Sequence, residues 1–181
     1  MELTAKTVIV TGGGAGIVQD FVDISEIDQA TIDRVMAVNF GGTVNVTRAF
    51  LSALLARGEG GRQRLQHGAL APFPGQSAYG ASKAAVALFT EGLRVEFRKT
   101  GVTVSVVYPG GVNTEITKNS GVESAAEADP ATEARVRKLL TQPAAPAAKI
   151  VRAVEKGTPR VIIGKDARVV DLLAGIMGKL T

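Results

Sequence analysis

A short β-branched run that ends in a glycine cluster most constrains the fold. The run, KTVIVT, spans residues 6–11, and Gly12, Gly13 and Gly14 follow it directly. An uninterrupted β-branched segment of this length is typical of a strand buried on both faces of a parallel sheet. The first element is therefore predicted to be a buried parallel strand that leads into a glycine loop.

The next segment changes to helical spacing. Between Ser25 and Arg57 apolar residues recur at helical intervals, and either Ser25 or Asp28 can cap the start. Two nearly continuous helices are predicted here, with room for a bend near residues 39–42. Residues 58–74 show no clear period and are predicted to be loop.

Strand and helix patterns alternate through the rest of the chain. Helices are predicted over 77–100, 131–140, 144–156 and 167–180, and strands over 101–108 and 160–163. This alternation indicates an α/β architecture with a parallel sheet. The 181 residues contain no internal repeat and no linker that would divide two domains, so a single domain over 1–181 is expected.

Composition excludes several classes of function. A hydrophobic share of 45% with 21% charged residues is that of a packed domain. With no cysteine and one histidine, His67, neither a disulfide framework nor a metal site is predicted. The net charge of +4 is spread along the chain, so nucleic-acid binding is not predicted. The first residues lack the apolar run of a signal peptide or membrane span, which makes a cytoplasmic location without membrane attachment the expectation.

Three segments carry residues suited to ligand chemistry. The loop TGGGAGI at residues 11–17 would let backbone amides approach a pyrophosphate, although a tight turn without a ligand explains it equally when taken alone. The PGGVNT segment at residues 109–114 ends a predicted parallel strand, where open α/β sheets bind ligands; taken alone it is a turn.

The third segment, SAYGASKAA, places Tyr79 and Lys83 four residues apart on one face of a predicted helix. A phenol has an ordinary pKa of about 10, and an adjacent ammonium is expected to lower that value by stabilising the phenolate. Such a pair could exchange a proton with an alcohol or carbonyl oxygen. A surface tyrosine and lysine without a role would have the same spacing.

Taken in order, these segments resemble the short-chain dehydrogenase/reductase family. The shared segments are the glycine loop, VMAVNFGGTVNVTRAF around Asn39, SAYGASKAA and VVYPGGVNTEI. Pro109 also follows Lys83 by 109 − 83 = 26 residues, as in that family. The resemblance implies a Rossmann-like parallel sheet with flanking helices and reversible hydride transfer between NAD or NADP and a small-molecule alcohol or carbonyl substrate.

The same resemblance implies roles for individual residues. Tyr79 would be the general acid/base, Lys83 would lower its pKa and hold the nicotinamide ribose, and Asn39 would position a proton-relay water. The residues implied to bind the cofactor are Gly12, Gly16, Ile17, Lys83, Pro109, Gly110 and Thr114.

The sequence departs from the family pattern in three places. Val18 takes the place of the third loop glycine, and the segment that should follow, about two βα units, is missing. No serine lies between Ser52 and Ser77, where the catalytic serine of the family would be expected. An alternative function is therefore a catalytically inactive remnant that acts, if at all, through association with itself or with longer relatives.

The missing segment predicts a rearranged sheet. Residues 6–11 would lose their usual neighbours and are expected to take the place of the fourth strand of the family. They would then lie beside the strand region that precedes Tyr79, with residues 102–108 beyond it. The adenine half of the pocket would not exist, so weak or undetectable dinucleotide binding is predicted.

The long helices predict self-association. The apolar faces of residues 44–55 and 86–97 match the helices that pair between subunits in this family. A homodimer or homotetramer is expected, because both faces left open would form a larger apolar patch than monomers usually tolerate.

Overall fold

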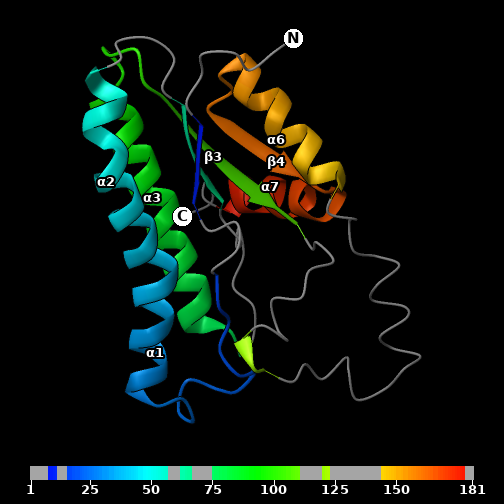
Figure 1. The fold of residues 1–181 in the computed structure, drawn as a ribbon. Helices are drawn as coiled ribbons and strands as arrows, with labels where there is room; N and C mark the ends of the chain where they lie inside the picture. Colours follow the sequence, from blue (N-terminus) through cyan, green and yellow to red (C-terminus); the bar gives the residue numbers. More distant parts are fainter. Residues whose placement is uncertain are drawn as a thin grey trace.

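The computed structural model describes residues 8–11, 16–56, 62–66, 75–110, 120–122 and 144–177 (Figure 1). The strands are β1 (Val8–Thr11), β2 (Arg62–Gln66), β3 (Thr103–Pro109) and β4 (Arg160–Ile163). The helices are α1 (Gln29–Met36), α2 (Gly42–Ala56), α3 (Ser77–Glu96), α6 (Ala144–Lys156) and α7 (Lys165–Met177), and the π-helical turn η1 (Ala37–Gly41) joins α1 to α2.

The four described strands form one parallel sheet in the order β1-β2-β3-β4, which is also their order in the chain. Arg62 of β2 is in register with Val8 on one side and with Thr103 on the other. Val106 of β3 is in register with Arg160 of β4. The predicted α/β fold, a Rossmann-like parallel sheet with flanking helices, is confirmed.

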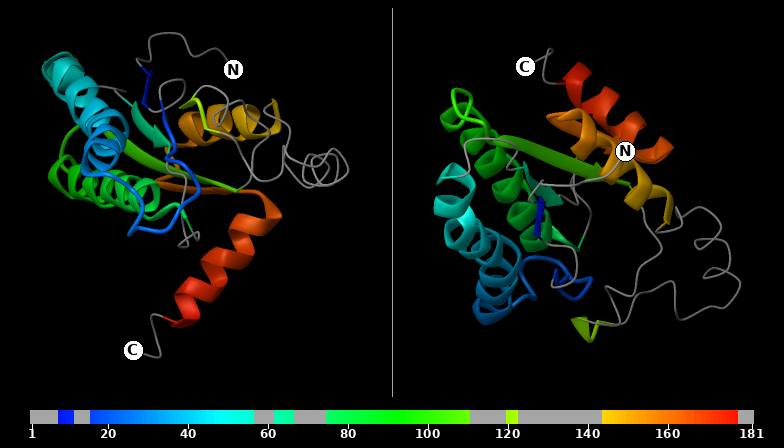
Figure 2. Two further views of the ribbon diagram at one scale, coloured as in Figure 1. Left: turned by 90° about the horizontal axis from the view of Figure 1, so that it is seen from below. Right: turned by 45° about the horizontal axis from the view of Figure 1, so that its top comes forward.

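The helices gather at two places around the sheet. α1, α2 and α3 lie together to one side of the strands, whereas α6 lies to the other (Figures 1 and 2). α3 packs on β3, and α6 and α7 both contact β4. The sheet therefore separates the α1–α3 group from α6.

The structure confirms the predicted place of the first strand. β1 pairs with β2, the strand that precedes the helix of Tyr79, and β3 lies beyond β2. The next described helices along the chain after β1 are α1 and α2.

One expectation is wrong. Residues 58–74 were expected to be loop, but residues 62–66 form β2 in the middle of the described sheet. The sequence of β2, RQRLQ, lacks the apolar pattern of a buried strand. Backbone pairing with β1 and β3 on both edges supplies the hydrogen bonds that make this segment a strand. The helix predicted over 131–140 lies outside the described residues.

The first helical region begins as the sequence allows. Asp28 caps α1, because its Oδ1 accepts a hydrogen bond of 2.6 Å from the backbone N–H of Thr31. This bond lowers the pKa of the Asp28 carboxyl. The π-helical turn η1 covers most of the region 39–42 in which the sequence allows a bend. Such turns are frequent at functional sites.

A buried core cluster lies between α3 and β3. A buried cluster of Leu93, Val102 and Val104 joins the two elements, with Phe89 and Phe97 packed against it. The ring of Phe89 also meets the ring of Phe40 edge-on, with 5.9 Å between their centroids, so η1 is fastened to the same helix. α3 therefore packs against both the sheet and η1.

The strand order can be tested by cross-linking, because the chain has no cysteine. Val10 is in register with Arg64, and Arg64 is in register with Ser105. The double substitution Val10→Cys with Arg64→Cys should form a disulfide on mild oxidation, since neighbouring strands lie about 4.8 Å apart. Val10→Cys with Ser105→Cys should form none, because two strand spacings are about 10 Å. Mass spectrometry of the oxidised chains reads both, and the reverse pattern would contradict the order.

Candidate active site

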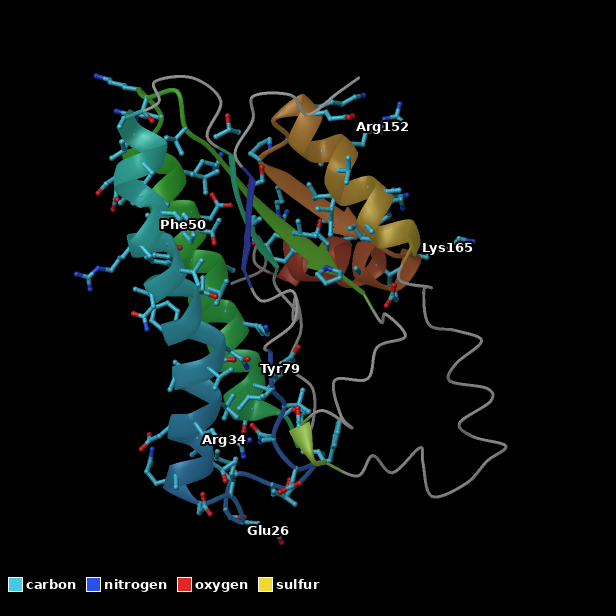
Figure 3. The ribbon with its side chains drawn as sticks, viewed as in Figure 1. Glu26, Arg34, Phe50, Tyr79, Arg152 and Lys165 are labelled. Atoms are coloured by element: carbon cyan, nitrogen blue, oxygen red, sulfur yellow. The ribbon has the colours of Figure 1, made fainter. Side chains whose placement is uncertain are left out.

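Tyr79 and Lys83 lie together near the amino end of α3, as the sequence predicts. The Lys83 side chain is only 5% exposed, and its Nζ lies 5.5 Å from the centre of the half-buried Tyr79 ring. Among the described residues, no hydrogen bond or ion pair holds this ammonium. Figure 3 shows Tyr79 at the end of α3 that adjoins residues 16–28, the described residues between β1 and α1, called below the segment after β1.

Burial shifts the pKa of both groups toward the neutral form. It raises the pKa of the Tyr79 phenol above its ordinary value of 10.0 and lowers the pKa of the Lys83 ammonium below 10.5. Desolvation therefore outweighs any effect of the neighbouring ammonium here, and the role of Lys83 in lowering the pKa of Tyr79 stays a prediction. The ammonium lies over the face of the ring, where it contacts the π-electrons, and desolvation of the phenolate is not offset.

Asn39 joins the segment after β1 to α3. Its Oδ1 accepts from the backbone N–H of Ile17, and its Nδ2 donates to the carbonyl oxygen of Ile17, both at 2.9 Å. The same Nδ2 donates to Ser82 Oγ at 3.0 Å. Both amide hydrogens of Asn39 are thus used inside the protein, in a site where its side chain is buried. Its role toward a proton-relay water stays a prediction.

Ser82 extends this chain of hydrogen bonds to the backbone of Tyr79. Its side chain is fully buried, accepts from Asn39, and donates from Oγ to the carbonyl oxygen of Tyr79 at 2.7 Å. The backbone of Tyr79 is therefore tied through two side chains to the segment after β1.

A second connection reaches the backbone N–H of Tyr79. Gln19 Oε1 accepts from it at 3.0 Å, while Gln19 Nε2 donates to the carbonyl oxygen of Gly75 at 3.1 Å. Gly75 has φ +73, and a Cβ there would lie 3.0 Å from the carbonyl carbon of Phe21. Only glycine fits this close approach without strain. The first turn of α3 is therefore packed directly on the segment after β1.

Sequence reasoning did not find Gln19 or Ser82. Gln19 lies in no motif, and Ser82 lies inside SAYGASKAA without any spacing that marks it. Their roles depend on contacts 60 and 43 residues apart in the chain, which no local pattern reports.

The residues implied for the cofactor are only partly brought together. Ile17 lies against Asn39, and Gly16 is next to it in the chain. Pro109 and Gly110 lie at the end of β3, where the Gly110 N–H donates to the carbonyl oxygen of Ile163 at 2.7 Å. The Asp166 carboxylate of α7 occupies the position that a Cβ at Gly110 would need. Gly12 and Thr114 lie outside the described residues.

The described residues contain neither a metal-binding cluster nor a membrane-spanning helix. No group of three or more His, Cys, Asp or Glu side chains is placed to hold a metal ion there. None of the described helices combines the length and apolar character needed to cross a membrane.

A parallel sheet with flanking helices, one of which carries the Tyr79–Lys83 pair, defines a protein of the Rossmann-like class. Comparison with known proteins narrows the class to a family. The family model for short chain dehydrogenases matches residues 7–125. The chain belongs to the short-chain dehydrogenase/reductase family of oxidoreductases.

Two curated relatives show how much of a longer protein this chain spans. SadH of Mycobacterium tuberculosis, named as an oxidoreductase, is 41% identical over 161 residues, covering 87% of this chain and 58% of SadH. Sulfoacetaldehyde reductase 2 of Chromohalobacter salexigens is 38% identical over 128 residues, covering 68% of this chain and 49% of the reductase. The chain therefore spans about half to three fifths of their length.

Solved structures have the same fold. A short-chain dehydrogenase of Streptomyces avermitilis has a TM-score of 0.75 at 27% identity, covering 96% of this chain and 66% of its own. A family member of Burkholderia cenocepacia in complex with NADP has a TM-score of 0.75 at 26% identity, covering 96% and 68%. One of Burkholderia phymatum in complex with NAD reaches 0.79 at 21% identity, covering 92% and 64%.

The direction of the Tyr79 pKa can be measured because the chain has two tyrosines and no tryptophan. In Tyr108→Phe, Tyr79 alone titrates, and the phenyl ring remains for the Arg160 guanidinium that lies 4.8 Å from the Tyr108 ring centre. The near-ultraviolet absorbance of the phenolate should rise with a midpoint above 10.0, because burial disfavours the charged form. A midpoint below 10.0 would mean that Lys83 controls the phenol instead.

Proposed function

We propose that this chain acts in NAD- or NADP-dependent hydride transfer to or from a small-molecule alcohol or carbonyl, with Tyr79 as the general acid/base. The observation that supports this best is the burial of Tyr79 and Lys83 against each other on one face of α3. Family membership and neighbours in complex with NAD or NADP support the cofactor class.

A protonated Tyr79 suits the acid role in carbonyl reduction. A phenol with a raised pKa keeps its proton at neutral pH, so Tyr79 is ready to donate that proton to a carbonyl oxygen. Carbonyl reduction is therefore the direction proposed. Lys83 would hold the nicotinamide ribose, and Asn39 keeps the segment after β1 beside the acid. The nicotinamide cofactor supplies the hydride when it is bound.

The described residues fit only part of a dinucleotide. Tyr79 and Lys83 offer a hydroxyl and an ammonium suited to the nicotinamide ribose. Doubly wound sheets bind a dinucleotide in the crevice where the strand order reverses. The described strands run β1-β2-β3-β4 without such a reversal. The pocket half that would hold adenine therefore has no counterpart in the described sheet, which supports weak cofactor binding.

The same strand order favours a second candidate function, an inactive remnant that associates with other chains. Apolar side chains remain exposed along α2 and α3, among them Phe50 and Leu88, the latter 76% exposed. Such side chains on neighbouring helices are suited to packing against another copy. Homodimer or homotetramer formation through these helices is proposed for either function.

Removal of the Tyr79 hydroxyl tests the proposed acid. Tyr79→Phe should lower any carbonyl-reductase turnover by about 10² to 10⁴, the usual contribution of a general acid. Tyr108→Phe is the matched control, because it removes the other phenol at the end of β3 and should leave turnover unchanged. Turnover of purified chains with NADH and NADPH checks both, and an active Tyr79→Phe would remove Tyr79 from the reaction.

Calorimetry with NADH and with NADPH tests the cofactor. Weak or undetectable binding is expected, because the described sheet has no reversal of strand order. If heat of binding is measurable, Lys83→Ala should reduce the affinity, since the ammonium is expected to contact the ribose. Micromolar affinity for either nucleotide would contradict the inferred loss of the adenine half.

Sedimentation tests the self-association. The chain should sediment as a dimer or tetramer at micromolar concentration, and Leu88→Glu should shift it toward monomer by placing a charge in the apolar contact. Val169→Glu on α7 is the control, because Val169 is also exposed but lies away from α2 and α3. A monodisperse monomer would count against this interface.

A further inference from the structure

The first turn of α3 has an unusual cap. The first backbone bond of the helix runs from the Gly80 N–H to the carbonyl oxygen of Gln76 at 2.8 Å, so the Tyr79 N–H lies just before the helical series. A capping side chain at the residue before the helix ordinarily accepts this N–H. Gln76 occupies that position and makes no such bond.

Gln19 supplies the missing acceptor from a distant part of the chain. Its Oε1 accepts the Tyr79 N–H at 3.0 Å across 60 residues of sequence, and its side chain is 1% exposed. The orientation of the amide is determined, because its Nε2 donates to the Gly75 carbonyl oxygen at 3.1 Å. A flipped amide would set oxygen against oxygen and N–H against N–H.

The backbone of Gln19 is held as firmly as its side chain. Gln76 Nε2 donates to the carbonyl oxygen of Gln19 at 2.8 Å. The preceding residue, Val18, donates its N–H to Ser120 Oγ at 3.1 Å, and Ile17 is held by Asn39. A glutamine fixed on both sides is placed to keep the first turn of α3 in one position.

We propose that Gln19 is a positioning residue for Tyr79. Its amide closes the first turn of α3, so the Tyr79 phenol stays in its desolvated place beside Lys83. This role rests on the proposed function, in which Tyr79 is the general acid. Loss of the Gln19 amide would open the turn, admit water to the phenol and bring its pKa back toward 10.0.

The test compares three substitutions in the full chain carrying Tyr108→Phe, where Tyr79 is the only tyrosine. Gln19→Leu removes both side-chain bonds at similar volume. Gln19→Glu keeps an oxygen acceptor for the Tyr79 N–H but replaces the donor to the Gly75 carbonyl oxygen with a second oxygen. Gln29→Leu is the matched control, because Gln29 also bonds through its side chain, to Asp33 at 2.8 Å, but is exposed on α1.

Two measurements report on Tyr79 without any turnover. Hydrogen exchange followed by NMR reads the Tyr79 N–H, and phenolate absorbance reads the titration of its side chain. Gln19→Leu should speed exchange of this N–H about tenfold, the scale of a lost helix cap, and should lower the titration midpoint. Gln19→Glu should keep the N–H protected without lowering the midpoint, since its carboxylate adds negative charge near the phenol. Gln29→Leu should change neither.

Unchanged exchange and midpoint in a folded Gln19→Leu would overturn the proposal. A midpoint lowered in Gln19→Glu while the Tyr79 N–H stays protected would overturn it as well, and this variant decides the matter if Gln19→Leu does not fold. Turnover is measured separately with each chain. An inactive parent would reject the proposed function while the exchange and titration results still judge Gln19. In an active parent, Gln19→Leu should lower kcat more than it changes KM.

Discussion

The double hydrogen bond between the Asn39 side chain and the Ile17 backbone is the interaction on which the site depends. It satisfies both the N–H and the C=O of Ile17 and holds the segment after β1 against η1. Because Asn39 also donates to Ser82, the same amide reaches the carbonyl oxygen of Tyr79. Gln19, two residues after Ile17, then meets the N–H of Tyr79. The buried Asn39 amide thus positions the segment after β1, and the N–H and the C=O of Tyr79 are both held by hydrogen bonds that lead to this segment.

The sheet shows how backbone pairing can outweigh side-chain composition. β2 carries RQRLQ, a sequence with little strand character, yet it lies between β1 and β3 and pairs with both. A central strand satisfies its N–H and C=O groups on both edges, and leaving these groups unpaired in a buried position would cost more than a poor side-chain pattern. β2 brings β1 to the place from which the following segment reaches α3.

The chemistry of the site follows from burial. Tyr79 and Lys83 are close, but the ammonium lies over the ring, and both groups are shifted toward neutrality by desolvation. This arrangement suits a tyrosine that donates a proton. The uniform strand order, by contrast, leaves the described sheet without the crevice that a complete dinucleotide requires. The Tyr79–Lys83 pair supports the proposed hydride transfer, and the strand order supports the alternative of an inactive remnant.

Local sequence determined those parts whose residues are neighbours in the chain. The β-branched run before the glycines predicted β1, the helical period and Asp28 predicted α1, and the four-residue spacing predicted that Tyr79 and Lys83 share a face. The family resemblance and its missing segment, together with the need of a strand for partners on its edges, placed β1 beside the region before Tyr79. Only the tertiary structure decided that RQRLQ is a strand, that Gln19 caps α3, and that burial raises the pKa of Tyr79. These three depend on contacts between distant segments and on exclusion of water, which no local pattern of residues encodes.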